Sequence, residues 1–350
     1  MKSWLAAFAV SLLFAAAAAG AAPVPAASGT APSANAPSAN APSANAPSGP
    51  LVLYTSQPDQ IAAETKAAFE ARYPAVRIRI FRSGTTQVMN KLAAEFLAGR
   101  PQPDVLLIAD AMSMQLLKDE GRLLPDYAVD LRAFSPALYD PGRTYFGTKL
   151  ITTGIICNTH APFVPRSWAD LLQPAAKNEV VLPNPLYSGA ALITAGAFAE
   201  YAPLGPDFLR HLAGAGAVAV AGNGAVLSAV AGGQKMFGMV VDFMALNAEK
   251  DGSPVRFVFP TEGVTAVTEP VAILKTAHNL PAARAFVAFL LSVSGQKLAV
   301  SQGFLPARRG IAPPPDYPRT GEIHLLPMNI PDILAHRKEL LGQFAQEFGD

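Results

Sequence analysis

Hydrophobic and polar positions follow a repeating order from residue 51 onward. A short apolar run at 51–54 precedes a polar stretch, after which apolar residues recur at helical spacing as far as Arg72. This order predicts a strand, a loop and a helix. The same order returns with a strand at 76–80, a helix, and a further strand at 105–108. Because strands that alternate with helices form parallel sheets with crossover connections, we expect a first lobe of the α/β class.

A second lobe with the same alternation is predicted after a crossing strand. Residues 149–158 are rich in β-branched side chains and form the predicted crossing. Three further strands are expected at 180–182, 218–220 and 236–241. A strand at 271–274 would return to the first lobe. Two crossing segments can act as a hinge about which the lobes close on a ligand.

The end of the chain is predicted to be helical. Helices are expected at 281–291 and 295–302, and an amphipathic helix follows whose apolar face should pack on the second lobe. Its residues at helical spacing are Ile333, Leu334, Arg337, Leu340, Leu341 and Phe344. The predicted domains are lobe 1 at 51–150 and 270–305, and lobe 2 at 151–269 and 306–350.

The N-terminal 50 residues differ from the rest of the chain. Lys2 precedes an apolar run that ends in small residues, which is the pattern of a secretory signal peptide over 1–21. An uncleaved membrane anchor is the alternative. Residues 22–50 include repeats of Ala, Pro, Ser and Asn with no large apolar side chain, which predicts a flexible linker. We therefore expect an exported, periplasmic protein.

Composition narrows the function. The 350 residues are 51% hydrophobic and 15% charged, with 27 basic and 26 acidic residues and a net charge of +1. A disordered chain or a nucleic-acid-binding protein would show low hydrophobicity or a basic excess. The single cysteine, Cys157, permits no intramolecular disulfide and no cysteine-ligated metal cluster, and its apolar setting predicts a buried thiol. No hydrolase, metalloprotease or nucleotide-binding motif is present, and the five histidines are scattered, so we predict no enzyme activity.

Polar loops at the predicted strand ends are the candidate binding site. Ligands bind at the carboxyl ends of strands in such sheets, and helix N-termini attract anions because their first N–H groups lack partners. In the first lobe the candidates are Thr55, Ser56, Ser83, Gly84, Thr85, Thr86 and Asp110. In the second lobe they are Ser188, Gly189, Ala190 and Asn223. Ordinary helix capping is the alternative for each loop, and the matching loops in both lobes favour a shared anion site.

Asp242 is the candidate acidic residue of the second lobe. It follows an apolar strand and precedes a predicted helix. It could accept hydrogen bonds from the ammonium group of a zwitterionic ligand. It could equally be a helix N-cap, and the two roles are compatible.

Long segments of the chain resemble a known family, the periplasmic solute-binding proteins of ABC importers. The similarity is strongest to the ferric-ion-binding-like cluster, whose relatives include binders of 2-aminoethylphosphonate. The segments that carry it are LVLYTSQPDQIAAETKAAFEARYPAVRIRIFRSG, QPDVLLIADAMSMQLLKDEGRLLP, NPLYSGAALITAGAF, GNGAVLSAVAGGQ and TEPVAILKTAHNLPAARAFVAFLLSVSGQKLAVSQGFLPAR. The resemblance implies an α/β, two-lobed periplasmic-binding-protein fold of type II and delivery of a captured solute to an inner-membrane permease.

Departures from the family pattern bear on the ligand. The family's iron-binding histidine position corresponds to Pro58, its glutamate to Ala109 or Asp110, and its tyrosine pair to Phe243 and Met244. Ferric ion prefers anionic oxygen ligands, which Phe and Met cannot supply. By contrast, the family's anion loop is retained at 188–190, with Asn223 at the position of an anion-contacting asparagine.

The sequence therefore predicts a monomeric solute-binding protein that closes on a small anionic solute and needs no cofactor. The expected solute is a phosphonate or organophosphate, with 2-aminoethylphosphonate as the example that suits an anion loop together with an acidic residue. Two alternatives stay open, which are a ferric-iron importer component with atypical ligands and an exported enzyme or sensor built on the same fold.

Overall fold

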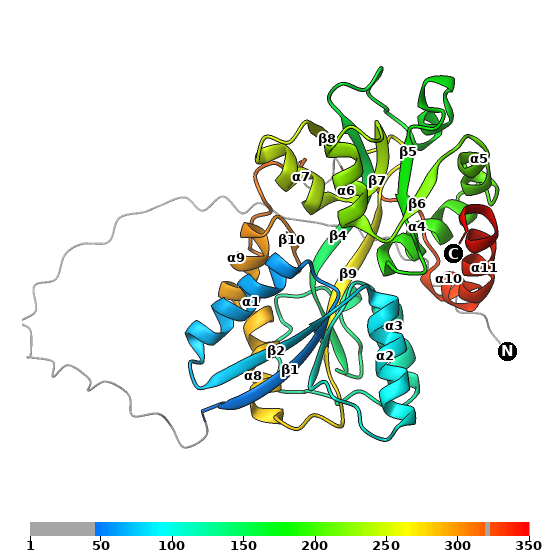
Figure 1. The fold of residues 1–350 in the computed structure, drawn as a ribbon. Coiled ribbons are helices and arrows are strands. Elements are labelled where there is room, and N and C mark those ends of the chain that lie inside the picture. The colour runs from blue at the N-terminus through cyan, green and yellow to red at the C-terminus, as the bar shows by residue number, and fades with distance from the viewer. Residues whose placement is uncertain (1–45, 319–322, 350) are drawn as a thin grey trace, which may run out of the picture.

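The computed structural model describes residues 46–318 and 323–349 and has two α/β lobes (Figure 1). The predicted signal peptide and most of the predicted linker lie outside these residues. Gly154 lies in the crossing strand between the lobes, as the sequence predicted. The α/β class is confirmed.

The first lobe is built on three parallel strands. β1 (Gly49–Thr55) pairs with β2 (Val76–Arg82) on one side and with β3 (Val105–Leu107) on the other. Helices α1 (Asp59–Arg72), α8 (Leu280–Leu291) and α9 (Val293–Ser301) lie on one side of this lobe, and α2 (Thr85–Leu97) and α3 (Ala111–Asp119) lie on the other (Figure 1). The sequence did not predict α3.

Two long antiparallel strands connect the lobes. β4 (Tyr145–Asn158) pairs with β9 (Thr265–Ile273), and β9 pairs with β3. The sheet order is β2-β1-β3-β9-β4-β7-β5-β6, so the strands of both lobes join through this central pair. The return strand is longer than predicted, since it starts at Thr265 and not at residue 271. These two strands are the two crossing segments that the sequence predicted as a hinge, and they are called the hinge strands below.

The second lobe repeats the arrangement. Its strands are β5 (Val180–Pro183), β6 (Val218–Val220), β7 (Phe237–Val241) and β8 (Val255–Val258). Its helices are α4 (Gly189–Glu200), α5 (Phe208–Gly214), α6 (Asn223–Ala231) and α7 (Asp242–Lys250). Short 3₁₀ turns occur at Pro136–Leu138, Trp168–Leu172 and Pro174–Ala176. The sequence did not predict α5 or β8.

The final helix is broken into two. After β10 (Leu305–Pro306), the chain forms α10 (Ile330–Ala335) and α11 (Arg337–Phe348), with His336 between them. The sequence predicted one continuous helix here. Phe344 of α11 is buried in the core of the second lobe, and both helices contact α4.

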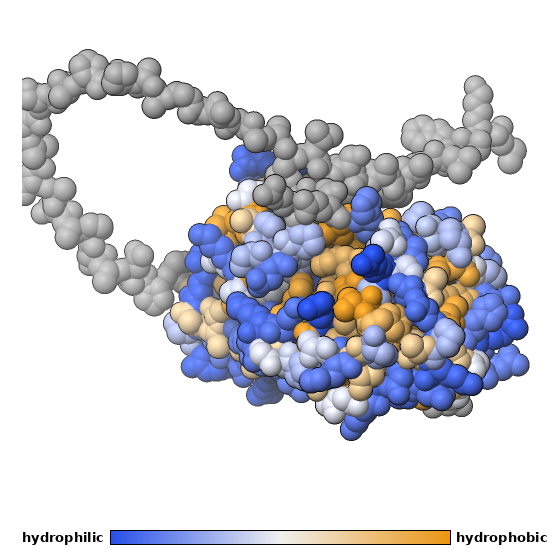
Figure 2. Space-filling model, turned by 90° about the horizontal axis from the view of Figure 1, so that it is seen from above, coloured by the Kyte–Doolittle hydropathy of each residue, from blue (hydrophilic) through white to orange (hydrophobic). Residues whose placement is uncertain are grey.

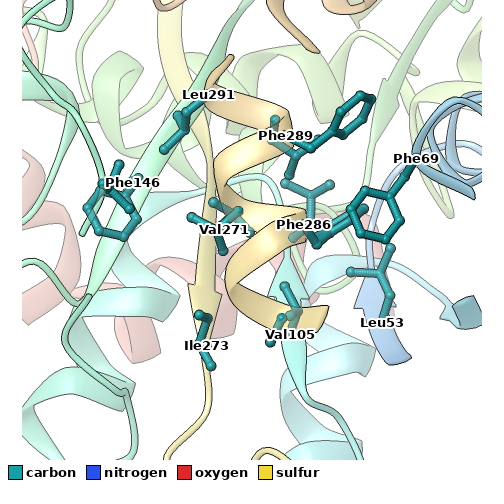
Figure 3. Packing of buried hydrophobic residues seen from close by; sticks show 14 of the residues in the cluster. Leu53, Phe69, Val105, Phe146, Val271, Ile273, Phe286, Phe289 and Leu291 are labelled. Atoms are coloured by element: carbon teal, nitrogen blue, oxygen red, sulfur yellow. The ribbon is translucent and has the colours of Figure 1, made fainter. Parts of the chain in front are cut away.

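Each lobe has its own aromatic core. In the first, Phe69 packs edge-on against Phe286 and Phe289 beside Leu53 and Val105 (Figure 3). In the second, a buried Trp168 stacks edge-on with Phe198, which meets Phe208. Each such side chain, when fully buried, stabilises the folded state by about 1.5–3 kcal/mol. A further apolar cluster, which includes Ile61, Met112, Leu192 and Phe243, is shared by the two lobes.

The surface seen in Figure 2 is largely hydrophilic, with hydrophobic residues gathered toward its middle. Within the described part of the chain, no single helix has the length and hydrophobicity to span a membrane. Helices α8 and α9 meet that test only when taken together, and they are bent by 63°.

Candidate functional site

The ends of β1 and β3 are tied together by two of the predicted site residues. The Thr55 hydroxyl donates to the carbonyl of Leu107 at 2.7 Å. The Ser56 hydroxyl accepts from the backbone N–H of Ala109 at 2.8 Å. Both hydroxyls therefore hold the loop that follows β3 in place, next to the site.

The N-terminus of α2 touches the second lobe. Gly84 precedes the helix without a side-chain cap, and a Cβ there would lie 2.5 Å from the carbonyl oxygen of Tyr187. The same carbonyl accepts from Thr86 N–H at 3.5 Å, and the Thr85 hydroxyl donates to the carbonyl of Ala109 at 3.3 Å. Ser83 N–H donates to a β1 carbonyl at 3.2 Å. Glycine allows this close approach because it has no side chain.

The N-terminus of α4 faces the first lobe. Ser188 caps this helix by accepting from Ala191 N–H at 3.3 Å, and the Asn223 amide donates to the same hydroxyl at 3.3 Å. A Cβ on Gly189 would lie 2.3 Å from Oδ2 of Asp110. Ala190 is buried against an apolar cluster. The two predicted loops therefore meet with the lobes in contact.

Asp110 occupies a strained position between β3 and α3. Its φ is 150° and its ψ is 140°, which non-glycine residues rarely adopt, and such strain concentrates at functional sites. Its carboxylate accepts from Ser113 N–H at 2.6 Å and from the Ser113 hydroxyl at 3.3 Å. Burial raises the pKa of Asp110 to about 6, although the hydrogen bonds from Ser113 and the charge of Arg337 oppose the increase.

A cavity of about 580 Å³ lies between α2 and α3 of the first lobe and reaches the start of α4 and Arg337 of the second. Four predicted residues line it, namely Thr85, Thr86, Asp110 and Gly189. Arg337, from the start of α11, is a fifth lining residue. The rest of the lining is largely apolar and includes Met89, Phe96, Met112, Leu116, Leu117 and Leu192. Hydroxyls and helix N-termini thus face the same space as four charged side chains, namely Asp110, Glu120, Arg122 and Arg337.

Asp242 lies elsewhere, where α7 begins against the hinge. Its side chain is fully buried and accepts from the Thr152 hydroxyl at 2.6 Å, from Thr152 N–H at 3.0 Å and from Phe243 N–H at 2.7 Å. Burial raises the pKa of Asp242 to about 6, against these hydrogen bonds. The carboxylate does not line the cavity and has no exposed surface for a ligand amine. Asp242 is the first residue of α7 and Val241 is its N-cap, so the predicted capping role is not observed, and the side chain of Asp242 instead joins α7 to the strand β4.

A buried ion pair joins the two hinge strands. Lys149 of β4 and Glu269 of β9 are 2.8 Å apart and are 4% and 3% exposed. The Gln57 amide donates to the same Glu269 oxygen at 2.9 Å, and the Lys149 ammonium lies 4.1 Å from the ring centre of Phe304. This pair links the loop after β1 to the hinge.

The positions that correspond to the family's tyrosine pair carry apolar side chains, Phe243 and Met244. Phe243 stacks against Phe304 with ring centres 4.1 Å apart, in an apolar cluster shared by both lobes. Over residues 46–318 and 323–349, no group of three or more His, Cys, Asp or Glu side chains is placed to hold a metal ion.

Three residues of this region were not predicted as site residues. Arg337 lines the cavity, the Tyr187 hydroxyl accepts from Arg82 of the other lobe at 3.3 Å, and Gln57 contacts Glu269. Arg337 was visible as a base on the apolar face of the predicted final helix. The other two sit beside predicted residues in the same loops.

Known proteins resemble the chain over most of its length. The model of a family described as "Bacterial extracellular solute-binding protein" matches residues 51–305. A curated protein of Haemophilus influenzae, described as an uncharacterized protein, is 28% identical over 273 residues, which cover 73% of this chain and 76% of that protein.

Two solved structures share the fold. The periplasmic binding protein AfuA from Actinobacillus pleuropneumoniae, with fructose-6-phosphate bound, has a TM-score of 0.76 and 23% identity and covers 86% of this chain and 98% of its own. Iron-bound HitA from Pseudomonas aeruginosa has a TM-score of 0.71 and 23% identity. The match covers 85% of this chain and 99% of the HitA chain. The expected two-lobed, type II α/β fold is confirmed.

Proposed function

The chain belongs to the bacterial extracellular solute-binding protein family, and we propose that it captures a small solute bearing a phosphonate or phosphate group for an ABC permease. The observation that carries this proposal is the cavity that both lobes line. Two helix N-termini, at Thr85 and Gly189, meet there from opposite lobes. Such ends carry partial positive charge, which suits an anion.

The amine or hydroxyl groups of the solute are assigned to Asp110. This carboxylate lines the cavity and accepts two hydrogen bonds from Ser113, and because a carboxylate has about four lone-pair sites it retains capacity to accept others. The sequence also suggested Asp242 for this role, but its buried carboxylate accepts hydrogen bonds from Thr152 and Phe243. 2-Aminoethylphosphonate fits an anion site with an acid nearby.

Phosphate esters suit the cavity better than ferric ion does. AfuA holds fructose-6-phosphate and HitA holds iron, so the fold serves both kinds of ligand. At the positions of the family's histidine and tyrosine pair this chain has Pro58, Phe243 and Met244, none of which supplies an anionic oxygen, so only the glutamate position, at Ala109 or Asp110, could retain one. The chain's hydroxyls and helix ends suit a tetrahedral oxyanion.

The remaining parts of the proposal concern location and role. We assign residues 1–21 to a secretory signal peptide and the mature protein to the periplasm, where it would act as a monomer that binds and releases solute without turnover. Closure about β4 and β9 would trap the solute and present the closed form to the inner-membrane permease.

A thermal-shift screen tests this function. The full-length protein is unfolded and refolded to remove carried-over solute, then mixed with 2-aminoethylphosphonate, fructose-6-phosphate, inorganic phosphate, citrate or ferric citrate. A solute that binds only the folded protein raises Tm by mass action. We expect the largest increase with a phosphonate or phosphate ester and none with citrate. An increase with ferric citrate alone would contradict the proposal and favour the iron alternative.

A further inference from the structure

The C-terminal helices contribute to the cavity although they lie outside the family match. That match ends at residue 305, whereas α10 and α11 cover residues 330–348. Arg337 is the first residue of α11 and lines the cavity with Thr85 and Asp110. The segment beyond residue 305 therefore supplies the charged side chain that the second lobe contributes to the cavity, whereas Asp110, Glu120 and Arg122 come from the first lobe.

Packing fixes α10 and α11 on the second lobe. Ile333 of α10 is buried against α4, where a Cβ on Gly196 would lie only 2.6 Å from the Ile333 side chain. Phe344 of α11 is buried in the core of the second lobe and stacks on Phe348. Arg337 is thus carried on the same rigid body as the α4 N-terminus. Its position relative to Gly189 does not depend on lobe closure.

The chemistry of Arg337 matches the proposed solute. A guanidinium group presents five N–H donors in a planar fork that can bind two oxygens of a phosphonate or phosphate together. Asp110, one of two acids that line the same cavity, belongs to the other lobe, and the charge of Arg337 lowers its pKa although the two side chains form no ion pair in the described structure. A solute that contacted both would bridge the lobes and favour the closed form.

Resting on the proposed function, we propose that Arg337 is a solute-binding residue that holds the phosphonate or phosphate group. α10 and α11 then form a specificity element added to the two-lobed fold. The anion is held by the second lobe through Arg337 and the α4 N-terminus, and Thr85 and Thr86 of the first lobe close onto it.

Titration calorimetry of arginine variants tests this assignment. The ligands are 2-aminoethylphosphonate and ethylphosphonate, which has the same anionic group without the amine. We expect Arg337→Gln to weaken both by about 10- to 100-fold, because a charge-assisted hydrogen bond is lost. The affinity of Arg337→Lys should lie between those of wild type and Arg337→Gln, because lysine keeps the positive charge but lacks the planar pair of N–H donors. Lys338→Gln, an exposed neighbour on the same helix, serves as the matched control and should bind as wild type does.

The outcomes separate the two proposals. If the wild-type protein binds a phosphonate and folded Arg337→Gln binds it within twofold of wild type, the assignment of Arg337 is wrong and the proposed function stands. If the wild-type protein binds neither phosphonate, nor any phosphate ester in the thermal-shift screen, the proposed function and the role of Arg337 both fail. If Lys338→Gln weakens binding as much as Arg337→Gln, the effect is one of general charge and Arg337 is not a contact.

Discussion

Asp110 and Asp242 are alike in most properties that a sequence or a burial calculation can show. Each follows an apolar strand, and each has at most 3% of its surface exposed to solvent. Burial raises the pKa of each to about 6. Their partners differ. Asp242 binds the hinge strand β4 through Thr152, whereas Asp110 faces a cavity that both lobes line. A buried acid after a strand therefore indicates a special position, and only its contacts show whether that position serves the fold or a ligand.

The same contrast extends to the neighbouring charges. At the hinge, Lys149 and Glu269 pair with each other and with Gln57, so their charges are satisfied within the chain. At the cavity, Arg337 and Asp110 come from opposite lobes and do not pair within the described residues. Three predictions test this contrast between a structural hinge and a binding cavity.

Lys149→Met should have the largest effect on stability. The substitution leaves Glu269 as a buried charge with only Gln57 as a side-chain partner, which costs about 3–5 kcal/mol in comparable buried pairs. Urea unfolding measures the free energy of unfolding. Arg210→Met, which breaks the exposed pair with Asp207, is the control and should cost less than about 1 kcal/mol. Equal effects of the two substitutions would show that the hinge pair is not structural.

Asp242→Asn should make stability depend on pH differently from wild type. Because the folded pKa of about 6 exceeds the ordinary value of 3.8, the folded state binds this proton more tightly than the unfolded chain does. The contribution of Asp242 is thus fully present below about pH 4 and is lost as pH rises through about 6. We expect the stability of wild type relative to the variant to fall by about 2–3 kcal/mol at most between pH 4 and pH 7. Urea unfolding of both proteins at pH 4 and pH 7 measures the free energy of unfolding. If wild type and the variant differed by the same amount at both pH values, the prediction would be contradicted.

Gly189→Ala should hinder closure with little effect on stability. The new Cβ would lie 2.3 Å from Asp110 Oδ2 and 2.4 Å from the carbonyl oxygen of Ala109, so the lobes must separate. We expect solute affinity to fall about tenfold, or 1.4 kcal/mol, and the radius of gyration with solute to stay at its open value. Gly214→Ala in α5, where a Cβ meets nothing within 4 Å, is the control. Unchanged affinity and normal compaction of Gly189→Ala would show that the lobes do not close through this contact.

Much of the fold could be predicted because periodicity reports local structure. The strands and most helices follow from apolar spacing, and the two loops at Gly84 and Gly189 were expected to meet because parallel strands place their carboxyl ends at one edge. The break at His336 was missed because the apolar spacing continues through it. Helix α5 has only seven residues, which is short for a periodic pattern.

The candidate site was less predictable because it depends on contacts between distant segments. Asp242 bonds Thr152, 90 residues away, and nothing in the local sequence of either residue indicates the pairing. Arg337 joins Asp110 in the cavity only because α11 packs against the second lobe and the lobes are in contact. In the sequence, Arg337 is one base on an amphipathic helix. Its candidate role in solute binding became visible only from the packing of α11 and the contact between the lobes.

The most direct test compares the two carboxylates with one ligand. Calorimetric titration of 2-aminoethylphosphonate into wild type, Asp110→Asn and Asp242→Asn measures whether the cavity or the hinge binds the amine. We expect Asp110→Asn to weaken binding by about 10- to 100-fold and Asp242→Asn, where folded, to bind as wild type does. Loss of binding in Asp242→Asn with full affinity in Asp110→Asn would contradict the account and place the amine at the hinge.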